Sequence, residues 1–400
     1  MPLPLSITSR LAPELYDLIL DEFHASKSTL SACSSVCRAW LLMCRRHLFF
    51  SVNLSPDFVK FLRNSEHAFA TITPHIRHVG LGGGWMREQK DEFNDIILFM
   101  ITLENVHKIH METWSWTYLA SPATKALLGG QGNVFQTVRA VDLKFIHFPS
   151  FNVLRTLASQ FPRLQELAFD NVTWDTSDSD PGPEAPPSFL SGLHKLKISA
   201  CSNRPIISWL SLKAAQPPPL RSLHLPEILP DESPLVGTFL TSLASTLEDL
   251  EFGFLVHNHD GMPALQDAIA KIDLSRHTRL RTIRIHQLAL YQLPSPPASP
   301  GAPADVSPYA WLAPLLARVG ARALAALAFD VWLGRESQLD VLDWRALVRV
   351  LASPSFASLA QVRFHVRGVE ASMDDAVRGW IAHRLRDWDG ADACLEASFE

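Results

Sequence analysis

Sulfur and imidazole side chains near the N-terminus are the groups best suited to metal chemistry. Cys33, Cys37, Cys44 and His47 lie close together in the sequence, and thiolate and imidazole groups are the usual ligands of structural zinc. However, Cys33 and Cys37 are spaced one helical turn apart, whereas structural zinc sites usually take their cysteine pairs from tight turns. A free cysteine on a helix commonly packs as a small hydrophobic residue. We therefore expect no metal site and no other cofactor.

A glycine run and a high histidine content are further patterns found in enzymes. Gly82, Gly83 and Gly84 follow an expected strand, but the Lys-Ser/Thr ending of a P-loop and the spaced glycines of a dinucleotide site are missing. We expect a tight turn there instead of a phosphate-binding loop. The 16 histidines are accompanied by no nucleophile motif around a serine or cysteine. The sequence thus favours a protein that is not an enzyme.

Composition favours an intracellular protein that binds neither membranes nor nucleic acids. The chain has 400 residues, of which 47% are hydrophobic, enough for a large core. Its formal net charge of −5 provides no basic surface for nucleic acids. The most apolar run, residues 96–103, is too short to span a bilayer, and MPLPLSITSR lacks the features of a signal peptide. Because the 5 cysteines are scattered, disulfides are not expected, and we expect the cytoplasm, the nucleus or both.

The first fifty residues are expected to form two or three short amphipathic helices. Leu15, Leu18 and Phe23 lie on one face of the first helix, and Pro13 is acceptable in its first turn because the missing N–H has no partner there. A later apolar stripe that ends at Trp40 predicts a second helix. A piece this small cannot bury so much apolar surface alone. It therefore either caps the rest of the chain or docks on another protein.

The order of these segments resembles the F-box, and especially the F-box-like proteins of fungi. LAPEL, LIL, VCRAW and HLFFSV follow one another as in that family, and VCRAW, residues 36–40, is the most specific part. The resemblance implies that residues 1–52 form a three-helix module that docks on the Skp-type adaptor of a cullin-based ubiquitin ligase. The family has proline directly after the first leucine, whereas Ala12 stands at that place here. The adaptor-binding residues that the resemblance implies are Leu11, Pro13, Glu14, Leu15, Ile19, Leu20, Val36, Cys37 and Trp40.

From residue 53 to residue 400, one short pattern recurs. Copies of the template apolar-x-x-apolar-x-apolar follow one another along the chain, with helical or loop segments between them. Such recurrence is typical of repeat proteins. The region resembles an irregular array of leucine-rich repeats, which implies a curved α/β solenoid with a parallel sheet on its concave side. A compact α/β domain with a mixed sheet is the alternative. The ten matches begin at Ile76, Val106, Val138, Leu164, Leu193, Leu220, Leu247, Leu280, Leu324 and Leu359.

The array departs from the leucine-rich-repeat pattern at one position in each unit. The family's asparagine or cysteine after the strand is present only as Cys201, and residues such as Trp114, Ile146 and Leu288 stand there elsewhere. We therefore expect no buried asparagine ladder and an irregular curvature. Segments 175–187 and 294–308 are rich in proline and are expected to be flexible surface insertions. Residues 374–389 are expected to form a last helix that caps the open end of the array.

On each strand, the residues between the apolar ones are expected to point away from the helices, on the concave face. They are acidic around Glu166 and Asp249 and basic in the last units, and such a graded surface can orient a protein partner. An ordinary solvated face is the alternative. The candidate target-binding residues are Lys108, His110, Asp142, Glu166, Asp170, Lys195, Lys197, Asp249, Glu251, Arg284 and His286.

Together these patterns favour the substrate-recognition subunit of a Skp–cullin–F-box type ubiquitin ligase. Such a subunit performs no bond chemistry itself, because it acts by holding a target close to a ubiquitin-loaded enzyme. Its expected partners are the Skp-type adaptor, the cullin complex and an unknown protein substrate. The alternative is a repeat scaffold for protein–protein interaction that belongs to no ligase.

Overall fold

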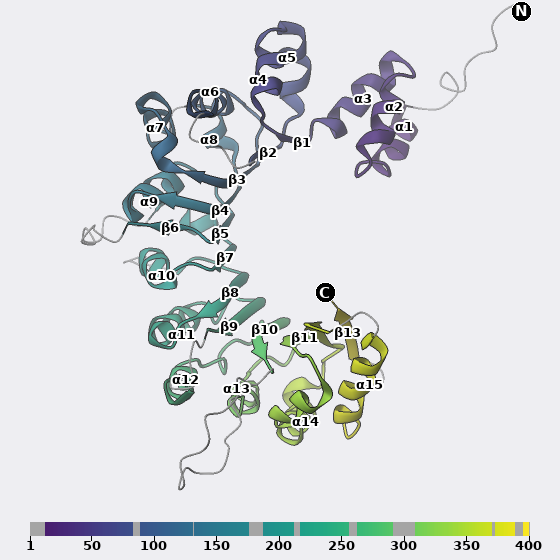
Figure 1. The fold of residues 1–400 in the computed structure, drawn as a ribbon, viewed down its shortest axis with the longest axis vertical. Helices are drawn as coiled ribbons and strands as arrows, with labels where there is room; N and C mark the ends of the chain where they lie inside the picture. The colour runs from purple at the N-terminus through teal and green to yellow at the C-terminus, as the bar shows by residue number, and fades with distance from the viewer. Residues whose placement is uncertain are drawn as a thin grey trace, which may run out of the picture. The chain divides into compact units, whose positions relative to one another are not determined.

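The computed structural model of the chain contains two compact units, Met1–Pro181 and Gly182–Glu400. The residues that it describes are 13–82, 89–130, 132–175, 187–211, 217–255, 262–290, 309–369, 373–388 and 395–399. Each unit contains parallel strands with helices along one side (Figure 1). Within the described ranges, no helix is both long enough and apolar enough to cross a membrane. The expected boundary after residue 52 stays a prediction.

The described part of the first unit begins with three short helices, where the sequence predicts two or three. They are α1 Pro13–Asp21, α2 Lys27–Ser34 and α3 Arg38–Leu48. The expected second helix with an apolar stripe ending at Trp40 is wrong, because the chain turns at residues 35–37 and Trp40 lies in the third helix. Ser26 caps α2, because its side chain accepts a hydrogen bond from the backbone N–H of Thr29 at 3.4 Å. Basic residues in the last turn of α3 interact favourably with the negative end of the helix dipole. Local sequence thus explains the beginning of α2 and stabilises the end of α3.

The three helices share a small core of their own, which we call the N-terminal core. It consists of the fully buried side chains of Leu20, Leu30 and Cys44, with Cys33 and Trp40 packed against them. Burial raises the pKa of the Cys44 thiol, and the neighbouring Cys33 raises it further. The buried Cys44 therefore acts as a small apolar residue in this core.

After the helices, the first unit continues as strands that alternate with helices. Its strands pair in the order β1-β2-β3-β4-β5, and β6 pairs with β4, in every case parallel. The strands are β1 Ser51–Asn53, β2 His78–Leu81, β3 Lys108–Ser115, β4 Ala140–Phe148, β5 Glu166–Asp170 and β6 Thr173–Trp174. The helices are α4 Pro56–Arg63, α5 Glu66–Ile72, α6 Lys90–Met100, α7 Ser121–Leu128, α8 Val134–Thr137 and α9 Phe151–Ser159.

The second unit has the same organisation. Its strands pair in the order β7-β8-β9-β10-β11-β12-β13, again with parallel registers. The strands are β7 Lys195–Ser199, β8 Ser222–Ile228, β9 Asp249–Phe254, β10 Thr282–Ala289, β11 Ala326–Trp332, β12 Gln361–Arg367 and β13 Leu395–Phe399. The helices are α10 Asn203–Ser211, α11 Ser233–Ser242, α12 Met262–Ala270, α13 Leu312–Ala317, α14 Trp344–Leu351 and α15 Asp374–Leu385.

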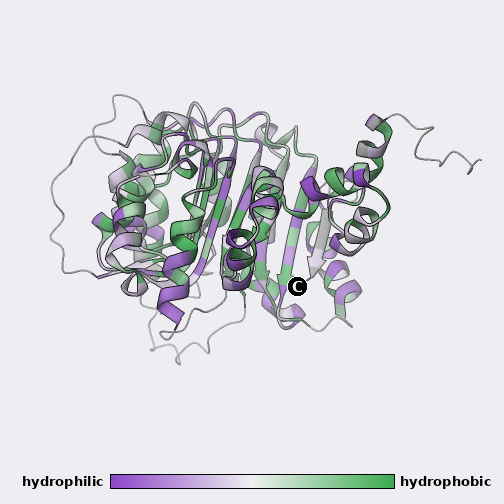
Figure 2. Cartoon of the chain, turned by 90° about the horizontal axis from the view of Figure 1, so that it is seen from above, coloured by the Kyte–Doolittle hydropathy of each residue, from purple (hydrophilic) through white to green (hydrophobic). Residues whose placement is uncertain are grey.

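Every match to the apolar template forms one of these strands, so the predicted repeat of strand and helix is confirmed for the described residues. The mixed-sheet alternative is wrong there, because all described strand pairs are parallel. The apolar template residues, such as Leu250 and Phe252 of β9, are buried. The residues between them remain partly exposed on the other face, which we call the helix-free face. Hydrophobic and hydrophilic bands alternate along the strands in Figure 2.

Residues in the left-handed backbone region interrupt this alternation where several strands end. After such a residue, the next side chain turns back toward the helices, so that Trp114, Ile146 and Leu288 are buried. These apolar side chains occupy the place of the family's asparagine, and the described part of the array has no asparagine there, as expected. The left-handed residues, with φ between 50° and 63°, are Thr113, Phe145, Asn171, Ala200 and Gln287.

A buried polar pair ties α10 to the segment before α11 in the second unit. The Glu232 side chain is buried and accepts hydrogen bonds from the backbone N–H groups of Asn203 at 2.9 Å and Arg204 at 3.1 Å. It also accepts one from the Asn203 side-chain amide at 2.8 Å. Because these N–H groups begin α10, Glu232 caps that helix from a distant part of the chain.

The C-terminal end differs from the expectation. The predicted last helix is present as α15, but the chain continues into β13, which pairs with β12. The helix therefore does not cap the end of the sheet, and the alternating sequence LEASF explains the added strand. The insertion 294–308, most of 175–187, Gly83 and Gly84 lie outside the described residues.

Candidate functional site

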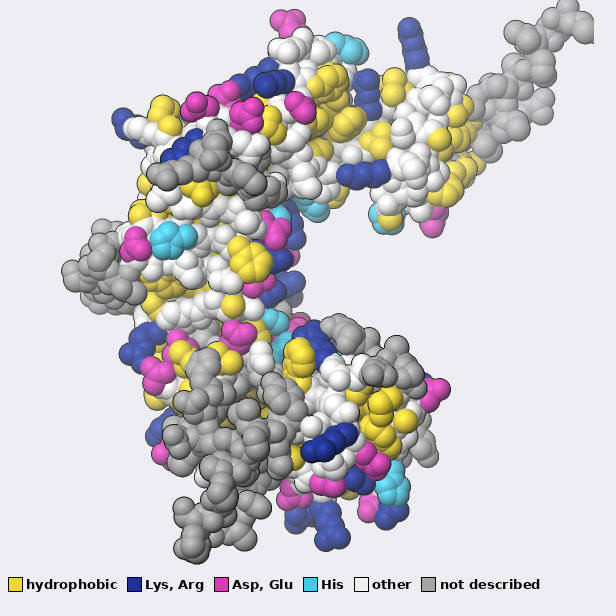
Figure 3. Space-filling view, viewed as in Figure 1, with side chains coloured by type: hydrophobic (Ala, Val, Ile, Leu, Met, Phe, Trp, Pro, Cys, Tyr) yellow, Lys and Arg dark blue, Asp and Glu magenta, His cyan; other side chains and the backbone are white. Residues whose placement is uncertain are grey.

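The N-terminal helices leave large apolar side chains exposed. On α1, Leu15, Leu18 and Ile19 are three and four residues apart and so share one face. Isolated exposed apolar residues are normal, but a cluster of them marks an interaction site. Hydrophobic side chains are visible on the surface of these helices in Figure 3. The exposed fractions are 44% for Leu15, 61% for Leu18, 42% for Ile19, 40% for Phe23, 58% for Val36 and 59% for Leu42.

Other residues that the F-box resemblance assigns to adaptor binding face inward. Leu20 is fully buried in the N-terminal core, so it cannot contact a partner while the helices remain folded. Trp40 is half-buried, and its ring packs against Tyr16 with 5.7 Å between the ring centroids. Both side chains hold the helices together.

The remaining residues of that set lie at the ends of helices. Pro13 is the first residue of α1, and the exposed Glu14 lies in its first turn. Cys37 precedes α3 with an extended backbone and is half-buried. Leu11 lies outside the described residues. Exposed apolar contact area is therefore concentrated on α1, with further contributions from Val36 and Leu42.

Phe50 connects the N-terminal helices to the first strands. Its carbonyl accepts hydrogen bonds from the backbone N–H groups of Arg77 at 3.0 Å and His78 at 2.8 Å. Its ring packs edge-on against His78, with 4.6 Å between the ring centroids. These contacts lie at the end of α3 and leave the apolar face of α1 exposed.

The helix-free face of the first unit carries a network of charged side chains. His110 of β3 lies 3.1 Å from the Asp142 carboxylate of β4 and 3.3 Å from the Glu112 carboxylate. Lys144 lies 3.3 Å from the second oxygen of Glu112. Hydrogen bonds with His110 and Lys144 hold the pKa of the Glu112 carboxyl below its usual value. This network brings together the predicted residues His110 and Asp142.

The other predicted residues of this face in the first unit lie in two rows across the strands. Lys108 is in register with Ala140, which is in register with Glu166. Asp170 is in register with Lys144. All of these polar side chains are at least partly exposed, as a binding face requires.

In the second unit, the same face contains a row of polar side chains from four strands. Lys197, His224, Glu251 and Arg284 follow one another in register on β7, β8, β9 and β10. A parallel row, two residues earlier, contains Lys195, Ser222, Asp249 and Thr282, and the Thr282 hydroxyl bonds the Asp249 carboxylate.

His286 lies between two carboxylates on this face. Its Nδ1 is 2.6 Å from Asp330 Oδ2, and its Nε2 is 3.1 Å from Glu251 Oε2. Burial by itself lowers the pKa of His286, but the hydrogen bonds with Asp330 and Glu251 outweigh it, so the pKa is raised. Asp330 is also buried, and the Arg284 guanidinium bonds its other oxygen at 2.8 Å. The negative charge of Asp330 is therefore compensated by Arg284.

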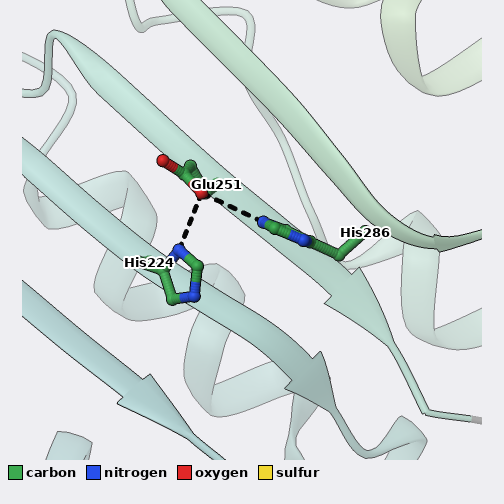
Figure 4. Close-up of side chains that lie close together, drawn as sticks. All are labelled: His224, Glu251 and His286. Carbon is green, nitrogen blue, oxygen red and sulfur yellow. Dashed lines mark hydrogen bonds and ion pairs between the residues drawn. The ribbon is translucent and has the colours of Figure 1, made fainter. Parts of the chain in front are cut away.

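Glu251 is the centre of this group. One of its oxygens, Oε2, bonds both His286 and Nδ1 of His224, the latter at 2.8 Å (Figure 4). Hydrogen bonds with His224 and His286 hold the pKa of the Glu251 carboxyl well below its usual value. Among the described residues, these three side chains form the group that lies close enough together to share an ion.

Sequence reasoning did not select Asp330 or His224 for this face. The sequence did contain a signal for Asp330. This residue directly follows the template match LAALAF, just as the predicted residue Asp170 directly follows the match LQELAF. His224 occupies the same template position as Glu251, one place before the last apolar residue. Comparing template positions across the repeats would have identified both residues.

No protein-family model matches the sequence, and no curated protein matches it either. Among solved structures, the chain is similar to the crystal structure of the Rad7 and Elc1 complex in yeast. That similarity has a TM-score of 0.42 and 15% sequence identity, and it covers 95% of this chain and 87% of the other chain. A similarity of this size assigns neither a family nor a function.

Proposed function

We propose that the chain is a substrate-recognition subunit of a Skp–cullin–F-box type ubiquitin ligase. The observation that carries the proposal is the exposed apolar face of α1, in a segment whose sequence resembles the F-box. In this proposal, Leu15, Leu18 and Ile19 contact the Skp-type adaptor, while Leu20 and Trp40 hold the three helices in position. The cullin complex then joins through the adaptor, and the protein works in the cytoplasm, the nucleus or both.

The exposure of α1 also argues against a role of the helices as a simple cap. A cap covers the end of an array with its own apolar face, so its large apolar side chains are buried. Here Phe50 and Lys27 contact the first strands and Phe49 stacks on Phe58 of α4, while Leu18 remains 61% exposed. An external partner is a better explanation for this apolar surface.

The helix-free face is the proposed surface for the target protein. It presents acidic, basic and imidazole groups in register, such as His110 and Asp142 in one unit and Glu251 and Arg284 in the other. Complementary charges on a target would determine orientation and specificity there. The protein itself performs no bond chemistry in this proposal. It raises the local concentration of the target's lysines near a ubiquitin-loaded enzyme.

The test is co-purification with a Skp-type adaptor, comparing the full-length chain with a chain that begins at Ser51. We expect a complex only with the full-length chain. In that chain, Leu15→Asp together with Leu18→Asp should weaken binding more than roughly 100-fold, because buried apolar anchors at an interface can each be worth ~2 kcal/mol or more. The matched control is Phe61→Asp, which changes a residue of α4 that is 52% exposed.

Two results would contradict the proposal. One is a folded full-length chain that binds no Skp-type adaptor, which would leave the repeat scaffold as the function. The other is equal loss of binding in the α1 double variant and in Phe61→Asp. Circular dichroism of each variant verifies that the helices are intact.

A further inference from the structure

Three neighbouring strands of the second unit place two imidazoles and a carboxylate around one point. His224 of β8 and Glu251 of β9 are directly in register. His286 of β10 is in register with Gly253, which has no side chain. A Cβ at Gly253 would lie 2.9 Å from the Cβ of His286 and 2.8 Å from its carbonyl oxygen. The missing side chain leaves the His286 ring room to extend to Glu251.

Two of the distances within this group are close to those between ligands of one metal ion. Glu251 Oε2 lies 2.8 Å from His224 Nδ1 and 3.1 Å from His286 Nε2, and all three donor atoms lie within 4.8 Å of one another. Ligands held about 2.0–2.1 Å from a zinc ion are themselves roughly 3 Å apart. An ion can therefore be accepted with small side-chain movements.

Asp330 supplies the support that a metal-binding histidine usually has. Its carboxylate bonds the far nitrogen of His286, Nδ1, at 2.6 Å, which leaves Nε2 directed at Glu251. Metal-binding histidines commonly donate their second N–H to such a carboxylate. Arg284 bonds Asp330 and holds it in place. Asp330 is 5% exposed, so this support is part of the packed interior.

We propose that His224 Nδ1, Glu251 Oε2 and His286 Nε2 bind one divalent transition-metal ion, with Zn²⁺ as the fitting example, and that Asp330 orients His286. Two imidazoles favour zinc and similar ions over calcium or magnesium, which prefer oxygen ligands. With three protein ligands, a zinc ion keeps a position for water or for a side chain of a bound protein. Glu251 and His224 are partly exposed on the helix-free face, so this position is reachable.

The test is isothermal titration of the full-length chain with Zn²⁺ after removal of metals by EDTA and dialysis. We expect one ion per chain, and Co²⁺ at the same site should give the visible absorption of a low-coordinate complex. His224→Ala and Glu251→Gln should each abolish this one-to-one binding. Asp330→Asn keeps all three ligands and should weaken binding roughly 10–100-fold.

The matched control is His110→Ala, which removes an imidazole between carboxylates in the first unit. It should leave zinc binding unchanged. The proposal is overturned if the wild type shows no saturable one-to-one binding, or if His110→Ala reduces binding as much as His224→Ala does. Since Glu251→Gln is nearly isosteric, it separates loss of a ligand from loss of the fold. Adaptor binding measured in EDTA should be unaffected, so the two proposals fail or succeed separately.

Discussion

Replacing Glu232 with alanine should destabilise α10 and its surroundings strongly. The Glu232 carboxylate is 2% exposed and accepts three hydrogen bonds from Asn203 and Arg204. It also accepts one from its own turn, from the Leu229 backbone N–H at 3.3 Å. Each buried donor that loses its acceptor costs ~1–3 kcal/mol, less where water can enter. We expect a total loss of about 3–5 kcal/mol in the free energy of unfolding.

The assay is hydrogen exchange of the backbone amides of α10 in the full-length chain. Because a chain with two compact units need not unfold in one step, local exchange is more informative than a single melting temperature. If the free energy of unfolding falls by ~3 kcal/mol or more, amides that exchange through global or subglobal opening should exchange more than roughly 100-fold faster.

The matched control is Glu227→Ala. The Glu227 carboxylate is partly exposed and accepts one hydrogen bond, from the Ala200 backbone N–H at 3.1 Å. Its loss should cost no more than about 1 kcal/mol. If Glu232→Ala accelerates exchange in α10 no more than Glu227→Ala does, the capping role of Glu232 is refuted.

Two further predictions concern pH and backbone strain. His277 is fully buried with Nε2 2.9 Å from the Leu240 carbonyl, and burial lowers its pKa despite this hydrogen bond. The pKa of this histidine in the unfolded chain is about 6.5, so on acidification the unfolded state takes up the proton first. The contribution of neutral His277 to the free energy of unfolding is therefore fully present above about pH 6.5 and is lost below it. The decrease in melting temperature on acidification should be smaller in His277→Gln than in the wild type, and an equal decrease would contradict this. Thr113 has φ of 59°, a conformation that is costly for a β-branched residue. Thr113→Asn should therefore raise the melting temperature, by an amount equivalent to up to ~1 kcal/mol in the free energy of unfolding. A lower melting temperature would show that the backbone at Thr113 is not strained.

The strands were predictable because their signal is local. Within each template match, a few neighbouring apolar residues decide which face is buried, and Leu223 and Leu225 of β8 are buried as this pattern requires. The left-handed residues were not predictable in this way. Thr113 and Phe145 are unusual choices for that conformation, and nothing in their side chains indicates it.

The exposed apolar face of α1 was predictable only in part. The apolar stripes contained Leu15 and Trp40, and the F-box resemblance added Leu20, but neither showed that Leu20 and Trp40 pack in the N-terminal core. In a small group of helices, nearly all apolar residues share similar spacing, so packing must decide which remain exposed. The contact between His286 and Asp330 could have been found by aligning the template matches. Each of the two residues directly follows a match, and the register of β10 with β11 places Ile285 opposite Phe329, one residue before the pair.

The order of strands in the second unit also has a consequence for folding. From β7 to β13, each strand pairs with the strands that precede and follow it in the chain. Pairing between consecutive strands keeps the paired segments close in sequence, so that a nucleus formed within the unit can grow from repeat to repeat. The unit can also lose β13 and then β12 without disturbing the strands before them. Amides of β13 and β12 should therefore exchange before those of β9 and β10, and limited proteolysis should shorten the unit stepwise from that side.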